Sequence, residues 1–208
     1  MTEKIDRNRP RVSDDISLNA EQSTGPANFA PLGQQFTFCP MCATELVYRQ
    51  LYDRLRQQCP ACGWIHFQDP KVGAGVIAEQ ESRVLLGRRG IDPGKGLWCF
   101  PSGFMEIDET SEEAAIREFK EETGLDVELA GLFGVYHFHS AVKGTGVLLL
   151  YRGRITGGVL AAMDDITELT FFSPDELPPD EELAFESNRN ALRRWKKEKN
   201  ESGKDFSI

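Results

Sequence analysis

The sequence predicts an α/β protein in which a mixed β-sheet with helices follows a small cysteine-rich module. Two observations lead to this prediction. Short apolar runs alternate with two helical segments over most of the chain, which is typical of an α/β domain. Four of the five cysteines are concentrated within residues 36–69. With 208 residues, the chain is long enough for one hydrophobic core and a small additional module.

The formal net charge of −9 argues against a nucleic-acid partner, because affinity for nucleic acids depends on Lys and Arg contacts to phosphate. The charge leaves open a small phosphate-bearing substrate, since metal ions can screen it. No apolar run approaches the roughly 20 residues that span a bilayer. The N-terminus has neither the apolar segment of a secretory signal nor the acid-poor composition of a transit peptide. We therefore expect a cytoplasmic protein with no membrane partner.

Composition divides the chain into four segments. Residues 1–35 are polar and have no hydrophobic period, which predicts a disordered N-terminal tail. Residues 36–69 form the cysteine-rich module. Residues 70–198 contain the apolar runs and helical segments of the main domain, and residues 199–208 are expected to form a C-terminal tail.

The cysteine-rich module has the spacing of a zinc ribbon. Cys39-Pro-Met-Cys42 and Cys59-Pro-Ala-Cys62 are separated by sixteen residues that can form a hairpin, and Gly63 suits the turn after the second pair. Each C-x-x-C pair can supply two corners of a tetrahedral Zn²⁺ site. Disulfides and a redox C-x-x-C are the alternatives. A cytoplasmic setting disfavours disulfides, and a redox site would require only one C-x-x-C pair.

Because all four positions are cysteine, the expected zinc site has no open coordination position and is structural. The ribbon then supports the fold or an interface, and reading a substrate is the second interpretation. Residues 36–66 contain three Arg and no Lys against one Glu and one Asp, which is weak support for nucleic-acid binding. The fifth cysteine, Cys99, lies between aromatic residues and is expected to be a buried apolar residue.

The main domain is expected to begin with a hairpin. The runs VGAGVIAE and RVLLGRR flank a polar EQES turn and predict two antiparallel strands. Further apolar runs predict later strands, and two helical periods predict helices. The predicted strands cover residues 129–139, 146–155 and 168–173, and the predicted helices cover residues 111–123 and about 181–197.

The first helix has clear boundary signals. Thr110 followed by Glu113 is a capping box, so the helix is expected to begin near Ser111. Gly124 is expected to end it, because glycine readily adopts the left-handed conformation that follows a helix.

The acids Glu118, Glu121 and Glu122 share one face of this helix on a 3.6-residue period. Like charges at this spacing repel one another, and Arg117 can hold one of them by charge pairing. A solvated acidic surface is one interpretation. The other is a site for Mg²⁺ or Mn²⁺, hard cations that prefer oxygen ligands and often share substrate phosphates. The second interpretation predicts a metal-dependent enzyme that acts on a phosphate or pyrophosphate.

Residues 103–125 resemble the signature of the Nudix hydrolase family. That signature is Gly, five residues, Glu, seven residues, and then Arg-Glu-apolar-x-Glu-Glu-x-Gly-apolar. Gly103 opens the pattern, Glu109 follows, and the run REFKEETGL from Arg117 fills every remaining defined position. The resemblance covers roughly residues 70–180. It implies a Nudix-type α/β fold, in which a mixed sheet is sandwiched between helices, behind the small N-terminal zinc ribbon.

The resemblance implies an enzyme that hydrolyses a nucleoside diphosphate linked to another moiety, with Mg²⁺ or Mn²⁺ as cofactor. By this resemblance Glu118 and Glu122 are the main metal ligands, and Glu121 is a further ligand or the base that activates water. The carbonyl of Gly103 joins the metal shell.

The same resemblance gives Arg117 the role of orienting the glutamates and Glu109 the role of stabilising the loop. In some Nudix enzymes the base comes from a downstream loop, where Glu168 is the candidate in this sequence. The alternative for Glu168 is a surface charge at a strand edge.

The substrate class follows from weaker motifs. A four-cysteine ribbon before a Nudix domain resembles the NADH pyrophosphatases, but their Ser-Gln-Pro-Trp-Pro-Phe-Pro motif is absent. The runs HFQDPK and LAFES resemble bacterial relatives of the plastid FAD and ADP-ribose pyrophosphatases. We expect a dinucleotide or nucleotide sugar such as FAD or ADP-ribose. The alternatives are an NADH or NAD-cap pyrophosphatase and a non-catalytic Nudix ligand sensor; the four intact signature glutamates favour an enzyme.

Four side chains beside the signature are candidates for contact with the substrate. Phe104 begins the signature loop, and Tyr136, Phe138 and His139 lie in a predicted strand after it. Aromatic rings there can stack on an adenine or flavin ring, and ordinary core packing is the alternative. Family members are often dimers, and the ribbon offers an interface for a homodimer.

Overall fold

The computed structural model describes residues 36–140 and 144–202. The predicted disordered tail, residues 1–35, lies outside the described residues. No described helix is long and apolar enough to cross a membrane.

The ribbon contains the hairpin that the sequence predicts between its cysteine pairs. Strands β1 (Val47–Leu51) and β2 (Arg54–Gln58) pair antiparallel, and a two-residue turn joins them. Three side chains of the ribbon, two of them cysteines, are buried together, and two aromatic rings pack against them. They are Cys39, Leu46 and Cys59, with Phe36 and Trp64. So small a core gives little stability by itself, and domains of this size usually depend on a metal or disulfides.

The main sheet has seven strands in the order β5-β4-β3-β8-β7, with β6 beside β3 and β9 beside β4. Strands β3 and β8 run parallel, whereas β3 and β4 run antiparallel, as do β7 and β8, so the sheet is mixed as predicted. The strands are β3 (Lys71–Gln80), β4 (Arg83–Arg89), β5 (Trp98–Cys99), β6 (Ser102–Phe104), β7 (Leu125–Ser140), β8 (Gly144–Gly158) and β9 (Ile166–Phe172).

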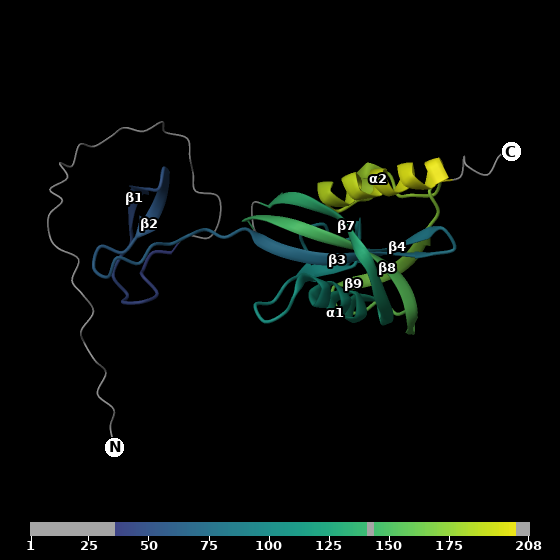
Figure 1. Ribbon diagram of the computed structural model, residues 1–208, viewed down its shortest axis with the longest axis horizontal. Coiled ribbons are helices and arrows are strands. Elements are labelled where there is room, and N and C mark those ends of the chain that lie inside the picture. The colour runs from purple at the N-terminus through teal and green to yellow at the C-terminus, as the bar shows by residue number, and fades with distance from the viewer. Residues whose placement is uncertain (1–35, 141–143, 203–208) are drawn as a thin grey trace, which may run out of the picture. The chain divides into compact units, whose positions relative to one another are not determined.

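Helices α1 (Ser111–Thr123) and α2 (Glu186–Ser202) cover opposite faces of this sheet (Figure 1). Each helix seals its own core. Phe119 of α1 is fully buried with side chains of β3 and β4, whereas Trp195 of α2 is fully buried with side chains of β7 and β8. The predicted sandwich of a mixed sheet between helices is confirmed.

The last helix begins later than the sequence predicts. Asp180–Glu182 form a short 3-10 helix instead of the first turn of α2. Leu183 then forms a bridge with Trp98, and the amide of Ala184 donates to the carbonyl of Trp98 at 2.9 Å. This pairing holds the chain extended, so α2 begins only at Glu186. The helix continues to Ser202, into the segment that we expected to be a C-terminal tail.

Two short strands, β5 and β6, were not predicted. They flank Pro101, whose carbonyl accepts a hydrogen bond from the amide of Val76 at 3.1 Å. A Cβ atom on Gly75 would lie 2.6 Å from the same carbonyl, so only glycine permits this approach. The strands place residues 102–104 beside β3 and lead directly into the signature loop.

Candidate active site

Helix α1 is fixed at both ends. Thr110 and Glu113 form the predicted capping box, with the amide of Thr110 donating to the Glu113 carboxylate at 2.8 Å. Gly124 has a φ of 71°, and its amide donates to the carbonyl of Lys120 at 2.9 Å. The helix therefore begins and ends at the predicted residues.

The chain after β8 also binds the C-terminal end of α1. The amides of Val159, Ala161 and Met163 donate to three consecutive carbonyls at 3.2, 2.9 and 3.2 Å. These carbonyls belong to Gly124, Thr123 and Glu122. Because a helix leaves its last carbonyls without internal partners, these bonds hold the acidic turn in place.

Arg117 is the centre of the acidic network on α1. Its guanidinium donates to Glu109 at 2.5 and 3.0 Å, to Glu118 at 2.7 Å and to Glu121 at 3.0 Å. It also donates to the carbonyl of Phe104 at 3.2 Å. The hydrogen bonds from Arg117 lower the pKa of Glu109 to about 2. One cation thus holds three carboxylates and the signature loop in one arrangement.

Glu122 is the buried acid of the network, with 3% of its surface exposed. Its carboxylate accepts a hydrogen bond from the amide of Ser102 at 2.8 Å. Burial raises the pKa of Glu122 to about 8, although the Ser102 amide opposes this shift. Burial also raises the pKa of Glu118, against the opposing effect of Arg117. Folding has therefore placed two carboxylates where their negative charge is poorly stabilised.

Gly103 lies against the carboxylate of Glu118. A Cβ atom at Gly103 would lie 2.1 Å from Glu118 Cδ and Oε2, so any side chain would displace the acid. Gly103 pairs with Ala74 of β3, which fixes the loop against the sheet. Glycine at the first signature position therefore lets the Glu118 carboxylate occupy this place.

Glu168 forms its ion pair with Arg88 of β4 and not with a residue of the signature. It is opposite Arg88 in the β4–β9 pairing, and its carboxylate accepts a hydrogen bond from Arg88 Nε at 2.8 Å. Its role as a base stays a prediction. The negative charges of Asp164 and Asp165 do raise the pKa of Glu118 and Glu122, respectively, although burial is the larger cause for both. We missed this Asp-Asp pair, although it lies in the segment that suggested Glu168.

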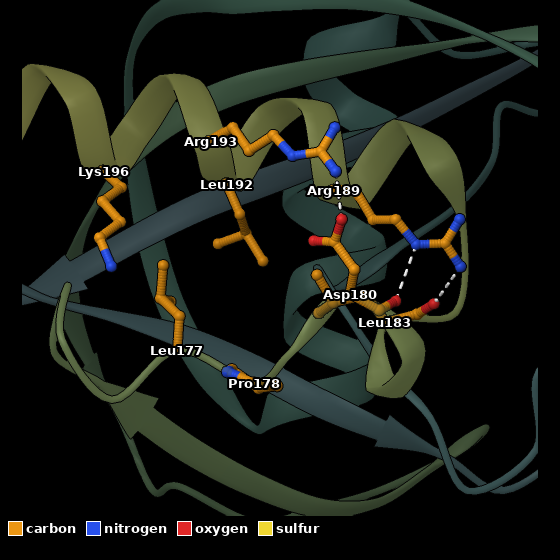
Figure 2. Close-up of a pocket in the computed structure, with 8 residues that line it drawn as sticks. All are labelled: Leu177, Pro178, Asp180, Leu183, Arg189, Leu192, Arg193 and Lys196. Atoms are coloured by element: carbon orange, nitrogen blue, oxygen red, sulfur yellow. Dashed lines mark hydrogen bonds and ion pairs between the residues drawn. The ribbon is translucent and has the colours of Figure 1, made fainter.

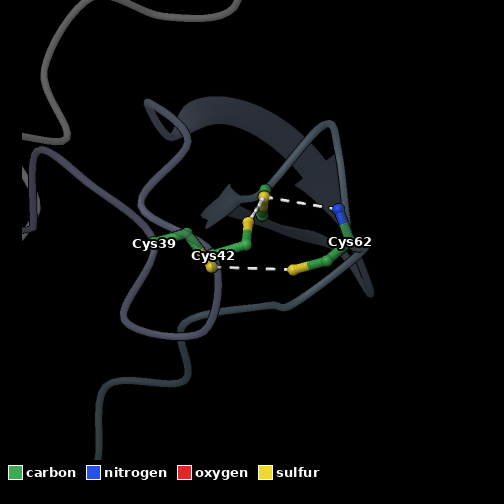
Figure 3. A group of neighbouring side chains, drawn as sticks. Cys39, Cys42 and Cys62 are labelled. Atoms are coloured by element: carbon green, nitrogen blue, oxygen red, sulfur yellow. Dashed lines mark hydrogen bonds between the residues drawn. The ribbon is translucent and has the colours of Figure 1, made fainter.

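The four ribbon cysteines converge as a metal site would require (Figure 3). Their sulfur atoms all lie within 4.8 Å of one another, with Cys39 Sγ 3.6 Å from Cys62 Sγ and Cys42 Sγ 3.4 Å from Cys59 Sγ. A tetrahedral zinc with bonds of about 2.3 Å has sulfur–sulfur edges of about 3.8 Å. The sulfur positions and the donor set therefore fit zinc.

Two amides orient the buried sulfurs of the ribbon. The amide of Met41 donates to Cys39 Sγ at 3.4 Å, and the amide of Cys62 donates to Cys59 Sγ at 3.4 Å. Each C-x-x-C pair is followed by a residue with positive φ, Ala43 at 57° and Gly63 at 78°. The two loops thus have matching geometry around the four sulfurs.

The acids of α1 offer the oxygen donors that Mg²⁺ and Mn²⁺ prefer. Within residues 36–140 and 144–202, however, the four cysteines are the only group of three or more His, Cys, Asp or Glu side chains whose ligand atoms converge as a metal site requires. Arg117 and the Ser102 amide hold the carboxylates of Glu118, Glu121 and Glu122. The donor chemistry fits a cation that keeps waters and shares substrate oxygens, rather than one enclosed by protein.

The structure separates the four candidate substrate contacts. The rings of Phe104 and Phe138 lie 6.3 Å apart, and Lys71 Nζ lies 5.0 Å from the centre of the Phe104 ring. Tyr136 and Phe138 are both half-buried and both pack against the core beneath α2. His139 Nδ1 lies 3.3 Å from Thr145 Oγ1 on the neighbouring strand. Of the four candidates, Phe104 and Phe138 form an aromatic pair, and Lys71 beside Phe104 was not predicted.

A cavity of about 180 Å³ lies between α2 and the segment before it (Figure 2). Arg189 donates to the carbonyls of Asp180 and Leu183 at 2.8 and 2.9 Å, and Arg193 forms an ion pair with the Asp180 carboxylate. None of its lining residues belongs to the signature, and small-molecule sites usually enclose about 300–1,000 Å³. These contacts hold the start of α2.

Comparison with known proteins identifies relatives of the whole main domain. The sequence profile of the NUDIX domain matches residues 69–195. The ADP-ribose pyrophosphatase of Methanocaldococcus jannaschii is 38% identical over 130 residues, which cover 61% of this chain and 75% of that protein. The NAD-capped RNA hydrolase NudC of Pseudomonas aeruginosa is 29% identical over 147 residues. That match covers 68% of this chain and 49% of NudC, about half of its length.

Among solved structures, a NUDIX hydrolase from Nitrosomonas europaea matches with a TM-score of 0.72 and 34% sequence identity. The match covers 80% of this chain and 93% of that structure. The agreement therefore extends beyond the signature to the arrangement of the sheet and helices.

Proposed function

Since the chain belongs to the NUDIX family and is a Nudix hydrolase, we propose that it hydrolyses the pyrophosphate bond of a dinucleotide or nucleotide sugar. ADP-ribose and NAD-like dinucleotides are the substrate classes that its relatives suggest, and FAD remains a candidate from the sequence motifs. The observation that carries this proposal is that Arg117 holds Glu118 and Glu121 on the helix that also carries the buried Glu122. A nucleoside monophosphate is one of the two products.

In this proposal Glu118, Glu122 and the carbonyl of Gly103 hold Mg²⁺ or Mn²⁺. A bound divalent cation neutralises charge on the pyrophosphate oxygens and lowers the pKa of water. Glu122 is fixed by the Ser102 amide, and Glu118 lies against Gly103, so both acids are oriented before substrate binds. Preorganised ligands reduce the reorganisation that catalysis would otherwise require.

The remaining signature residues position these acids and receive the proton. Arg117 and Glu109 form a charge pair that fixes the loop relative to α1. Water oxygen attacks one phosphorus atom, the bond from that phosphorus to the bridging oxygen breaks, and the water proton passes to a carboxylate. We assign that carboxylate to Glu121, whose side chain is 50% exposed, with Glu168 as the alternative.

The aromatic pair of Phe104 and Phe138, with Lys71, is proposed to contact the base or sugar of the substrate. The carbonyl of Phe104 accepts a hydrogen bond from Arg117, which links the segment that carries this ring to the acids of α1. Tyr136 and His139 remain candidates; Tyr136 packs against the same core as Phe138, and His139 contacts Thr145.

The ribbon is proposed to hold a structural zinc through Cys39, Cys42, Cys59 and Cys62. Its core is small, so metal binding would supply folding free energy to this segment. A reducing compartment such as the cytoplasm would keep the thiols available for the metal. We expect elemental analysis to find one zinc per chain and a Cys59→Ser variant to lose it. Full zinc content in that variant would contradict this assignment.

The function is tested by a hydrolysis panel of ADP-ribose, NADH, FAD, diadenosine polyphosphates and NAD-capped RNA. Each substrate is incubated with Mg²⁺, with Mn²⁺ or with EDTA, and products are separated by chromatography. Wild type is compared with Glu122→Gln and with Glu198→Gln, a matched change on α2 outside the signature.

We expect one substrate class to release a nucleoside monophosphate only with metal, in wild type and Glu198→Gln but not in Glu122→Gln. Tight binding of one substrate without cleavage under any metal would replace the hydrolase with a ligand sensor. Sedimentation of the same preparation tests the homodimer, which stays a prediction.

A further inference from the structure

The hairpin of the ribbon carries an unbalanced positive face. Strands β1 and β2, with the sequences VYRQL and RLRQQ, contain three Arg and no acid. Arg49 pairs directly with Arg56, and Leu51 pairs with Arg54. Paired residues of antiparallel strands lie on the same face, and residues two apart along a strand do so as well. Arg49, Arg54 and Arg56 therefore share one face.

This arrangement is unfavourable for folding alone, because like charges directly opposite each other in a sheet are destabilising. Among the residues that the structure describes, no carboxylate forms an ion pair with Arg49, Arg54 or Arg56. Arg49 and Arg54 are exposed. Over residues 36–69 the acids balance the arginines in number. The strand register nevertheless places all three arginines on one face. The net charge of −9 conceals this local patch.

Two exposed aromatic rings lie beside the same face. Tyr52 is 74% exposed and Phe67 is 51% exposed, and their rings stack with centres 6.4 Å apart and an interplanar angle of 23°. The Arg56 guanidinium lies 5.8 Å from the Tyr52 ring and 5.2 Å from the Phe67 ring. It also donates to the carbonyl of Leu51, which fixes it between strand and rings.

The turn that presents Tyr52 is strained. Tyr52 and Asp53 have φ values of 51° and 61°, in the left-handed region where glycine or asparagine is usual. A bulky aromatic residue there costs folding free energy, and its ring is largely exposed instead of joining the core. Strain of this kind is often retained at binding surfaces.

We infer that this face of the ribbon, formed by Arg49, Arg54, Arg56, Tyr52 and Phe67, binds single-stranded nucleic acid. The exposed guanidinium groups of Arg49 and Arg54 match the phosphate backbone, and the exposed rings match unstacked bases. Together these features are typical of single-strand binding surfaces. Arginine and aromatic residues are also enriched at protein–protein interfaces, so association between chains is the competing outcome of the test below. The inference extends the proposed function, since it gives the hydrolase a second site for a chain attached to its substrate, and it can be tested without hydrolysis.

The test measures binding of a fluorescein-labelled single-stranded oligouridylate of about 12 nucleotides, a length within the usual site size of single-strand binding folds. Fluorescence anisotropy is recorded with the full zinc-loaded chain, without Mg²⁺ or Mn²⁺, from about 0.05 to 0.2 M salt. The first variant, Arg49→Gln/Arg54→Gln, removes two exposed charges. The second, Tyr52→Asn, removes the ring and places asparagine, which tolerates positive φ, in the turn. The matched control is Arg83→Gln/Arg154→Gln, which removes two exposed charges from the main domain.

We expect wild type and the control to bind alike. The Arg49→Gln/Arg54→Gln variant should bind at least about tenfold more weakly, with the salt slope reduced by about 1.4 for two lost phosphate contacts. Tyr52→Asn should bind about tenfold more weakly with an unchanged salt slope, because stacking is lost and charge is not. Zinc content equal to wild type in each variant excludes unfolding of the ribbon as the cause.

The inference is overturned if wild type shows no binding at the lowest salt, or if the ribbon variants bind as well as the control. It is also overturned if wild type is a dimer that Arg49→Gln/Arg54→Gln converts to monomers without changing oligonucleotide binding, since the face would then join two chains. Failure of ADP-ribose hydrolysis would leave the binding result unaffected, so the two proposals fail separately.

Discussion

Two charged networks lie on opposite faces of the main sheet, and they differ in their charge balance. On α1, the single cation Arg117 is bonded to Glu109, Glu118 and Glu121, and Glu122 lies buried beside them. On α2, two acids meet three cations. Arg152 and Lys199 contact Glu79, and Arg152 and Arg194 contact Glu198.

The network at α2, in which cations outnumber acids, also packs an aromatic ring. The guanidinium groups of Arg152 and Arg194 lie 4.6 and 4.3 Å from the centre of the Phe133 ring. Arg194 further donates to the carbonyl of Phe133. This network joins α2 to β7 and β8. Cations neutralise both of its acids. It has the properties of a structural link between a helix and a sheet.

The network on α1 leaves negative charge that folding does not neutralise. The raised pKa values of Glu118 and Glu122 reflect that deficit, because burial has removed water without supplying enough positive charge. A divalent cation would relieve it, and so would removal of one acid. The comparison therefore predicts that changes on α1 alter activity, whereas changes on α2 alter stability.

The largest expected effect is on hydrolysis. Glu122→Gln removes a proposed metal ligand, and since metal ions supply several kcal/mol of transition-state stabilisation, kcat/KM should fall roughly 10³-fold. The free energy of unfolding should stay equal or rise, because a buried carboxylate is replaced by a neutral amide. Steady-state kinetics and urea denaturation measure both quantities. A large loss of stability would contradict the functional interpretation of this acid.

Trp195→Ala should have the largest effect on stability. The side chain is fully buried beneath α2, and replacement of such a residue by alanine costs about 3–5 kcal/mol. Urea denaturation followed by circular dichroism measures the change, and Lys197→Ala, at an exposed position on the same helix, is the control. A loss below about 1 kcal/mol would mean that α2 contributes little to the core.

Arg117→Lys should lower kcat/KM by about 10- to 100-fold, the usual cost of losing a residue that orients metal ligands. Lysine keeps the positive charge but cannot reach Glu109, Glu118 and Glu121 together with the geometry of a guanidinium. The metal concentration needed for half-maximal activity should rise. Unchanged kinetics would show that charge alone suffices.

Glu198→Gln should lower the free energy of unfolding by about 1 kcal/mol and change kcat/KM less than about twofold, because its partners are partly exposed. The measurements are the same denaturation and kinetic assays. Loss of activity with unchanged stability would reverse the assignment of the two networks.

The smallest effect is expected for Glu168→Gln. The change removes one carboxylate of a half-exposed ion pair with Arg88, so kcat/KM should change less than about threefold. Glu121→Gln, in contrast, should lower kcat by about 10²-fold or more, as expected for loss of a general base. The opposite result would transfer the proton-accepting role to Glu168.

Local signals made α1 predictable from the sequence. Its capping box and terminal glycine lie next to the residues that they control, so residues 111–123 could be assigned in full. The cysteine pairs and the hairpin between them have the same local character. The structure then shows that their sulfur atoms converge, as the spacing requires.

Contacts distant in sequence could not be predicted. Glu168 meets Arg88 eighty residues away because β9 pairs with β4, and nothing near either residue indicates this pairing. The delayed start of α2 depends on the pairing of Leu183 with Trp98. The arginine face of the ribbon depends on strand register, which a count of charges does not contain.

The central claim is that the acids on α1 bind a divalent cation and those on α2 do not. The most direct measurement is Mn²⁺ binding by electron paramagnetic resonance, with wild type, Glu122→Gln and Glu198→Gln compared at equal protein concentration. The account predicts at least about tenfold weaker Mn²⁺ binding in Glu122→Gln and unchanged binding in Glu198→Gln. Equal binding by all three proteins, or weaker binding in Glu198→Gln alone, would contradict it.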